Sequence, residues 1–149
     1  MEGILKNIEK PNIILVGKNL NPIRTMGGIE ITPDVDMKNM RITNGDVLVL
    51  SGADTWLNEN NDEILNFVKA NIGSGILISA ICGATIALAN YGVLNDIKHT
   101  SNDLGLLKMI CPNYKGENHY CNQPVVVENN VITAAFLAPL EFAYEIIKK

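Results

Sequence analysis

The sequence predicts an α/β fold in which helices cover both faces of a parallel sheet. Short runs of β-branched and other apolar residues alternate along the chain with longer segments whose apolar residues recur at helical spacing. The chain has 149 residues, 47% of them hydrophobic and 19% charged, which is typical of a globular protein with a sizeable core. Because strands that alternate with helices form parallel sheets, we expect a single α/β domain over residues 1–149.

After its first ten residues, the first half of the chain holds three predicted strand regions and one predicted helix. The run NIILVG is a short β-branched strand, and PIRTMGGIEITPD contains two short strands that meet in a hairpin at two glycines. GDVLVLSGAD is a continuous apolar run, the pattern of a strand buried on both faces. NDEILNFVKANIGSG has an acidic first turn and a closing glycine, which predicts a helix. These stretches are residues 12–17, 22–34, 45–54 and 61–75.

The second half alternates in the same way. GILISAI is a buried strand, and GATIALANYGVL is a helix closed by Gly92. SNDLGLLKMICP predicts a helix that begins at a capping serine or asparagine and ends before its proline. PVVVENNVITAA predicts two strands around the Asn129-Asn130 turn, and LEFAYEIIKK predicts an amphipathic helix with lysines at its negative end. These stretches are residues 75–81, 83–94, 101–112, 124–135 and 140–149.

Composition and charge exclude several classes of partner. The net charge is −4 without any cluster of lysine and arginine, so we expect no nucleic-acid partner. The apolar runs are too short to span a bilayer, and acids within the first apolar stretch are unlike a signal peptide. The three cysteines are odd in number and widely spaced, which argues against disulfides and against zinc. We therefore expect a cytoplasmic protein with no metal, no cofactor and no membrane partner.

The stretch ISAICGATIALAN, residues 78–90, joins a predicted strand to a predicted helix at Cys82. In parallel sheets the carboxyl ends of the strands carry function, and Cys82 ends its strand just ahead of Gly83 and Ala84. Small residues allow the tight turn that exposes a nucleophile, and the helix N-terminus favours the reactive thiolate. A free cysteine packed as a small hydrophobic residue is the alternative.

Five motifs occur in one order along the chain: DVLVLSGADTW, AICGAT, KHTSN, PNYKGE and NVITAAFLAPLEFAYEII. In order and spacing they resemble the ThiJ/PfpI superfamily, and most of all its small bacterial protease-like and stress-associated members. The resemblance implies a flavodoxin-like sandwich of the glutamine amidotransferase-like type, usually a homodimer, with the cysteine on a strained elbow. Members act as glyoxalases, deglycases, peptidases, isonitrile hydratases, redox sensors and chaperones, so the fold does not fix the reaction.

Carried over residue by residue, the resemblance makes Cys82 the nucleophile and His99, in KHTSN, its proton-transfer partner. The backbone N–H groups of Gly83 and Ala53 would form the oxyanion hole. Ala53 departs from the family, which has glycine there, and an alanine disfavours a positive φ. His119 matches no family role.

The N-terminal stretch MEGILKNIEK predicts a helix, because its apolar residues fall on one face. In the superfamily a glutamate on the first helix hydrogen-bonds the cysteine sulfur, and Glu2 matches that position; a solvent-exposed chain end is the alternative. In the family an apolar strand precedes this helix, and we expect that strand to be missing from these 149 residues. We expect residues 12–17 and 45–54 either to flank the resulting gap or to close on each other.

Together these features predict a cysteine-dependent enzyme that acts on a small carbonyl or amide compound, in the manner of a glyoxalase, deglycase or hydrolase. The alternatives are a non-catalytic thiol redox sensor, a stress chaperone and an inactive truncated copy. A glutamine amidotransferase triad is not expected, because it needs a histidine two residues before a glutamate and LAPLEFAYE has no histidine. The expected partners are a small-molecule substrate and a second copy of the chain.

Overall fold

The computed structural model describes residues 11–58 and 60–149. The chain divides into two compact units, Met1–Arg41 and Ile42–Lys149. The predicted helix over the first ten residues, and with it Glu2, lies outside the described residues. The prediction of a single domain over the whole chain stays a prediction.

Residues 11–41, the described part of the first unit, hold four short strands, which pair as two small sheets. The predicted hairpin is confirmed: β2 (Ile23–Arg24) and β3 (Glu30–Ile31) are antiparallel. The predicted strand 12–17 is shorter than expected, because only β1 (Val16–Gly17) pairs, in parallel, with β4 (Val35–Asp36). This register sets Pro33 opposite Ile14, and a proline has no N–H to continue the ladder.

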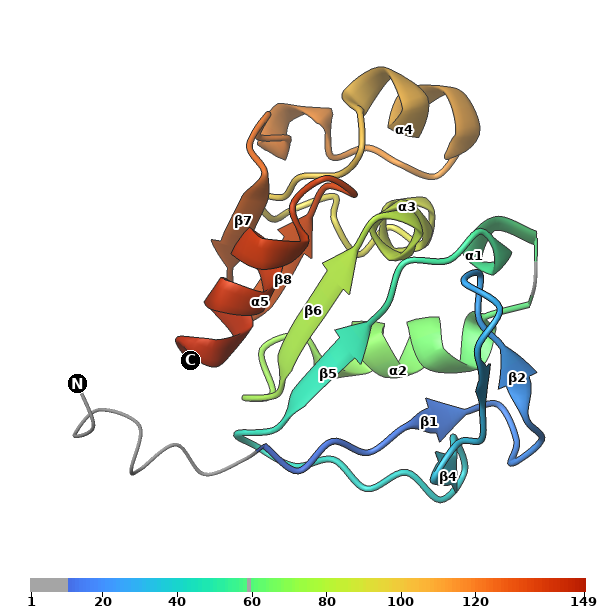
Figure 1. The fold of residues 1–149 in the computed structure, drawn as a ribbon. Coiled ribbons are helices and arrows are strands. Elements are labelled where there is room, and N and C mark those ends of the chain that lie inside the picture. The colour runs from blue at the N-terminus through green and yellow to red at the C-terminus, as the bar shows by residue number, and fades with distance from the viewer. Residues whose placement is uncertain (1–10, 59) are drawn as a thin grey trace, which may run out of the picture. The chain divides into compact units, whose positions relative to one another are not determined.

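The second unit is built on a four-stranded sheet in the order β5-β6-β8-β7. The strands are β5 (Val47–Leu50), β6 (Leu77–Ile81), β7 (Val125–Glu128) and β8 (Val131–Ala134). The first three in the sheet are parallel and β7 is antiparallel to β8, as the arrowheads in Figure 1 show. Both residues of the predicted Asn-Asn turn have positive φ, 50° and 58°, so the hairpin is confirmed.

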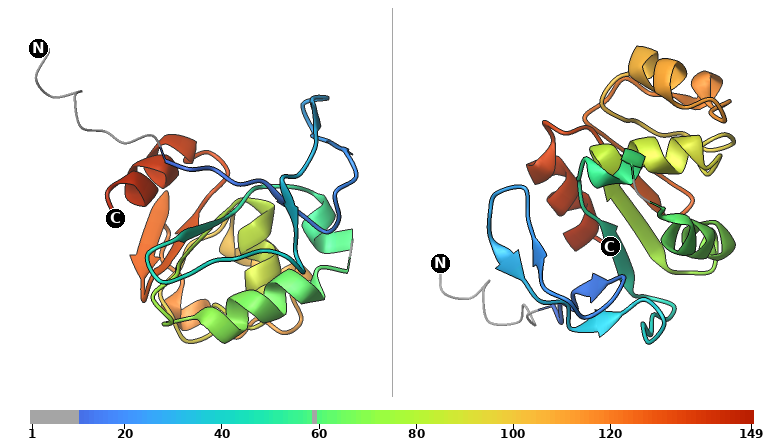
Figure 2. Two further views of the ribbon diagram at one scale, coloured as in Figure 1. Left: turned by 90° about the horizontal axis from the view of Figure 1, so that it is seen from below. Right: turned by 90° about the vertical axis from the view of Figure 1, so that its right-hand side faces the viewer.

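Helices cover both faces of this sheet, which confirms the predicted fold class. In Figure 2, right, α5 lies on one side of the sheet, with α2 and α3 on the other. No helix of the described residues is long and apolar enough to cross a membrane. The helices of the unit are α1 (Thr55–Asn58), α2 (Asp62–Asn71), α3 (Gly83–Asn90), α4 (Leu104–Ile110) and α5 (Pro139–Ile147), with a 3₁₀ turn at Glu117–His119.

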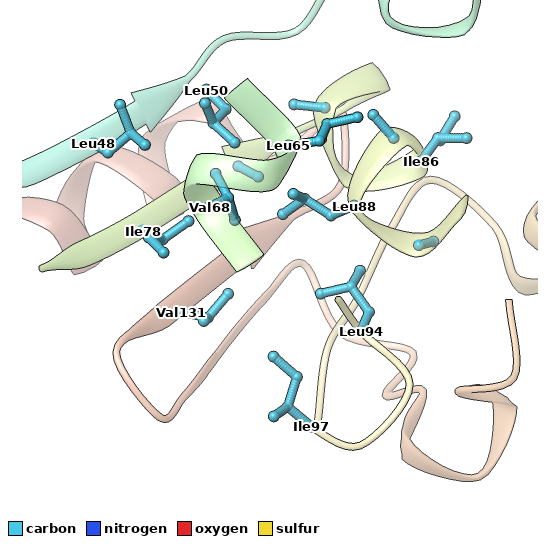
Figure 3. Close-up of a cluster of buried hydrophobic side chains, with 14 of the residues drawn as sticks. Leu48, Leu50, Leu65, Val68, Ile78, Ile86, Leu88, Leu94, Ile97 and Val131 are labelled. Carbon is cyan, nitrogen blue, oxygen red and sulfur yellow. The ribbon is translucent and has the colours of Figure 1, made fainter. Parts of the chain in front are cut away.

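The main core lies between the sheet and the helices α2 and α3 (Figure 3). The prediction that β5 is buried on both faces is wrong: Leu48 and Leu50 enter the core, whereas Val47 and Val49 are exposed. The cause is the placement of α5, which packs on β6, β7 and β8. Among the described strands, β5 is therefore an edge strand covered on one face.

The predicted cap of α4 is also corrected. The helix begins after Asp103, whose carboxylate accepts a hydrogen bond from the N–H of Leu106, 2.8 Å away. Ser101 and Asn102, the residues expected to cap it, lie in the segment before the helix, and their side chains bond elsewhere. That segment belongs to the candidate site.

Candidate functional site

Cys82 occupies a one-residue elbow between β6 and α3. Its backbone has φ 58° and ψ −125°, a region that residues with a Cβ rarely adopt and that costs about 1–3 kcal/mol. The predicted strained elbow is confirmed. The thiol is half-buried, and the Cys82 N–H donates to the carbonyl of Ala134 at the end of β8, 3.1 Å away. The strain therefore falls on the residue that carries the sulfur.

Hydrogen bonds hold the elbow in this conformation. The Cys82 carbonyl accepts from the N–H of Thr85 at 3.0 Å and from its hydroxyl at 2.6 Å. The Thr85 hydroxyl also lies 2.7 Å from the hydroxyl of Ser101. Since the single hydroxyl proton of Thr85 goes to Cys82, Ser101 is the donor in the second bond. Both side chains are fully buried, so the surrounding structure over-determines the strained backbone.

The loop after β5 packs directly against the elbow. A Cβ added to Gly52 would lie 2.9 Å from the Cβ of Cys82, and one added to Gly83 would overlap the carbonyl oxygen of Ala53. Both positions thus require glycine for close approach. Ala53 is not among the residues of positive φ, so an alanine there carries no strain. As the first residue of α3, Gly83 has an N–H with no partner inside the helix.

Asn102 provides the polar contact to the sulfur. Its Nδ2 lies 3.7 Å from Cys82 Sγ, within the range for a hydrogen bond to sulfur. Its Oδ1 accepts the N–H of Phe136, 3.0 Å away, in the turn after β8. Three adjacent strand ends therefore converge here, because the loop after β5, the elbow after β6 and the turn after β8 all lie at the carboxyl edge of the sheet.

The structure does not bring His99 into hydrogen bonding with the thiol. Its side chain is fully buried, with Nδ1 2.7 Å from the carbonyl of Ile97 and Nε2 2.8 Å from the hydroxyl of Tyr114. Burial lowers the pKa of His99, and the hydrogen bond to Ile97 opposes this shift. Both ring nitrogens of His99 therefore have hydrogen-bond partners other than the thiol.

The side chain of the KHTSN motif that contacts the sulfur in the structure is Asn102, and the proton-transfer role expected for His99 stays a prediction. His99 and Asn102 both belong to KHTSN, and His99 bridges to Tyr120 in extended pairing. The backbone bends at Asn102, and of the two residues it is Asn102 whose side chain contacts the sulfur.

The other two cysteines lie in different surroundings. Cys111 is buried at the C-terminal end of α4, and burial raises the pKa of its thiol. Cys121 is half-buried, with its sulfur 3.7 Å from the carbonyl of His119. Across residues 11–58 and 60–149, no group of three or more His, Cys, Asp or Glu side chains is arranged to hold a metal ion.

Similar proteins share both the sequence and this architecture. The chain is 45% identical over 137 residues to a Bacillus subtilis (strain 168) protein named "Uncharacterized protease YoaZ", covering 92% of this chain and 65% of the relative. It is 26% identical over 141 residues to "Glutathione-independent glyoxalase DJR-1.2" of Caenorhabditis elegans, covering 91% and 72% of the two chains. This chain thus spans less than two thirds of the length of the Bacillus subtilis relative.

A solved structure extends the likeness to three dimensions. The thiJ/pfpI family protein from Bacillus anthracis superposes with a TM-score of 0.91 at 45% identity, covering 96% of this chain and 68% of that one. The sequence model of the DJ-1/PfpI family matches residues 4–149. The chain therefore belongs to the DJ-1/PfpI family.

Proposed function

We propose that this chain is a cysteine-dependent enzyme that acts on a small carbonyl or amide compound, with Cys82 as its nucleophile. The observation that carries the proposal is the strained backbone of Cys82, φ 58°, at the junction of β6 and α3. Strain of this kind collects at functional sites, and the geometry points a nucleophile away from its strand. The relatives named protease and glyoxalase support an enzymatic role.

In the proposed first step, the Cys82 thiolate attacks the carbonyl carbon of the substrate. A bond forms between sulfur and carbon, and the electron pair of the C=O π bond moves to oxygen. The N–H groups of Gly83 and Ala53 are the proposed donors to that oxygen, which then takes a proton from water. His99 has no proton-transfer role in this proposal, because its ring nitrogens bond Ile97 and Tyr114.

The proposal is tested by following the consumption of methylglyoxal and the hydrolysis of an amino-acid p-nitroanilide. Cys82→Ser is expected to abolish whichever activity the unaltered chain shows. Cys121→Ser is the matched control, since it removes another half-buried thiol and should retain the activity. Equal rates for the unaltered chain and Cys82→Ser, or no turnover of either compound, would overturn the proposal.

A thiol redox sensor is the second candidate, and the half-buried position of Cys82 favours it. The thiolate would attack hydrogen peroxide, forming a sulfenate and releasing water. Peroxide that oxidises Cys82 while methylglyoxal and the p-nitroanilide remain unchanged would support this second candidate. The homodimer and the cytoplasmic location expected from the sequence stay predictions.

A further inference from the structure

We propose that Asn102 activates Cys82 by donating a hydrogen bond from its side-chain amide to the thiolate. This inference rests on the proposed function, since it names the group that supports the nucleophile. It assigns to a neutral amide the place at the sulfur that sequence reasoning gave to a histidine. The contact is the 3.7 Å separation between Asn102 Nδ2 and Cys82 Sγ.

The orientation of the Asn102 amide follows from its second hydrogen bond. The Phe136 N–H is only a donor, so the atom that faces it at 3.0 Å must be the carbonyl oxygen of Asn102. The NH₂ group is thereby turned toward the sulfur. An N–H that points at sulfur stabilises the thiolate, because hydrogen bonding to a charged form favours that form.

Two hydrogen bonds fix the backbone that leads to Asn102. Ser101 bonds Thr85 in the first turn of α3, and the N–H of Thr100 donates to the Thr133 hydroxyl on β8 at 2.9 Å. The segment is thus tied to the helix that follows the elbow and to the strand next to β6. A donor held this firmly requires little reorganisation when the charge on sulfur develops.

An amide donor has a consequence that a histidine would not share. Asn102 does not titrate, so it cannot take up the thiol proton, which must leave to solvent. The rate at which Cys82 reacts with iodoacetamide should then follow a single ionisation as the pH rises. His99 should contribute no second step, because its side chain is buried and bonded elsewhere.

Asn102→Asp tests the proposal with little change of shape. The aspartate keeps an oxygen for the Phe136 N–H and replaces the donor at sulfur with a negatively charged acceptor. We expect the pH midpoint of Cys82 alkylation to rise by about one pH unit or more, with alkylation about tenfold slower at pH 7. Alkylation is measured residue by residue with iodoacetamide and mass spectrometry.

Asn95→Asp is the matched control, because the Asn95 side-chain oxygen also accepts a backbone N–H, that of Lys115, at 2.8 Å. Asn95→Asp adds the same charge as Asn102→Asp and should leave the pH midpoint of Cys82 alkylation unchanged. Asn102→Ala removes the donor without adding charge and should also slow the alkylation, so it decides the matter if Asn102→Asp loses its circular dichroism signal. His99→Gln should leave the shape of the profile unchanged.

Unaltered Cys82 alkylation in both folded Asn102 variants would overturn the proposal, and so would a second pH step that disappears in His99→Gln. These outcomes are independent of catalysis. If Cys82→Ser keeps its activity while Asn102→Asp shifts the alkylation midpoint, the proposed function fails and the role of Asn102 stands. If Cys82→Ser loses activity and neither Asn102 variant shifts the alkylation midpoint, the proposed function stands and the role of Asn102 fails.

Discussion

Two polar regions of the second unit contain a cysteine, and they differ in almost every physical respect. The strand-end rim consists of residues 51–53, Cys82, Gly83 and Asn102, and its thiol is half-buried on strained backbone. The buried polar cluster consists of His99, Cys111 and the half-buried Tyr114, whose side chains make hydrogen bonds to protein groups.

Burial shifts the pKa of every member of the buried polar cluster in the direction that favours its uncharged form. Desolvation lowers the pKa of His99, raises that of Cys111 and raises that of Tyr114 to about 12. The nearby Tyr120 raises the pKa of the Tyr114 phenol further. The lesson is that histidine, cysteine and tyrosine side by side do not make a reactive site when their surroundings favour uncharged forms. Chemistry is expected at the rim, where amide donors approach the sulfur.

The largest loss of stability is expected at Gly83, where the rim has room for a glycine but not for a larger residue. Gly83→Ala would drive a methyl group into the carbonyl of Ala53, so backbone must move and the free energy of unfolding should fall by about 1–3 kcal/mol. Gly27→Ala is the control, because its added methyl group meets nothing closer than 3.9 Å. Urea unfolding measures both. Equal losses for the two variants would show that the close approach at the rim is not a structural requirement.

The next effect concerns the buried polar cluster and its pH dependence. The pKa of folded His99 lies below its ordinary value of 6.5, so above pH 6.5 both folded and unfolded chains are neutral there. Below pH 6.5 the unfolded chain binds a proton that the folded protein does not, so the free energy of unfolding falls as the pH falls. The loss from this residue is at most about 1.4 kcal/mol per pH unit.

Unfolding at pH 7.5 and pH 5.5 tests this expectation. His119→Gln removes an exposed imidazole and should keep most of the loss, whereas His99→Gln should reduce it. If His119→Gln removes the loss and His99→Gln keeps it, the buried polar cluster is not the source of the pH dependence.

A smaller change in stability is expected from the different backbone conformations of Cys82 and Cys111. Cys82→Ala and Cys82→Gly both remove the thiol, but only glycine relieves the positive φ, so Cys82→Gly should be more stable by about 1 kcal/mol. At Cys111, where φ is −114°, the same pair should reverse, with glycine less stable than alanine by a similar amount. Thermal unfolding of the four variants measures this, and the same sign at both positions would contradict the strained elbow.

The fold of the second unit was predictable because its elements are strongly patterned. Apolar runs and a glycine-rich junction located β6 and α3, and the Asn-Asn pair located the β7–β8 turn. The burial of β5 was not predictable, because it depends on where α5 lands across the sheet. The shortness of β1 was missed for a similar reason: its pairing stops where Pro33, two residues before β4, would lie opposite Ile14.

The strained elbow at Cys82 was predictable from the sequence. A local sequence pattern indicates Cys82: an apolar strand ends at this cysteine, and a glycine follows it. Asn102 has no such local signal, because its approach to the sulfur depends on the tertiary placement of its segment and on a bond to Phe136, 34 residues away in the chain. Local patterns reveal elbows, whereas the groups that face an elbow come from tertiary structure.

Site-resolved alkylation of the folded chain tests most directly the claim that Cys82 is the activated thiol. Iodoacetamide at pH 7 should label Cys82 first, ahead of half-buried Cys121 and about 100-fold or more ahead of Cys111, whose burial limits access and raises the pKa of its thiol. Mass spectrometry of timed samples gives the three rates. Equal rates for the three cysteines in folded protein would contradict the account.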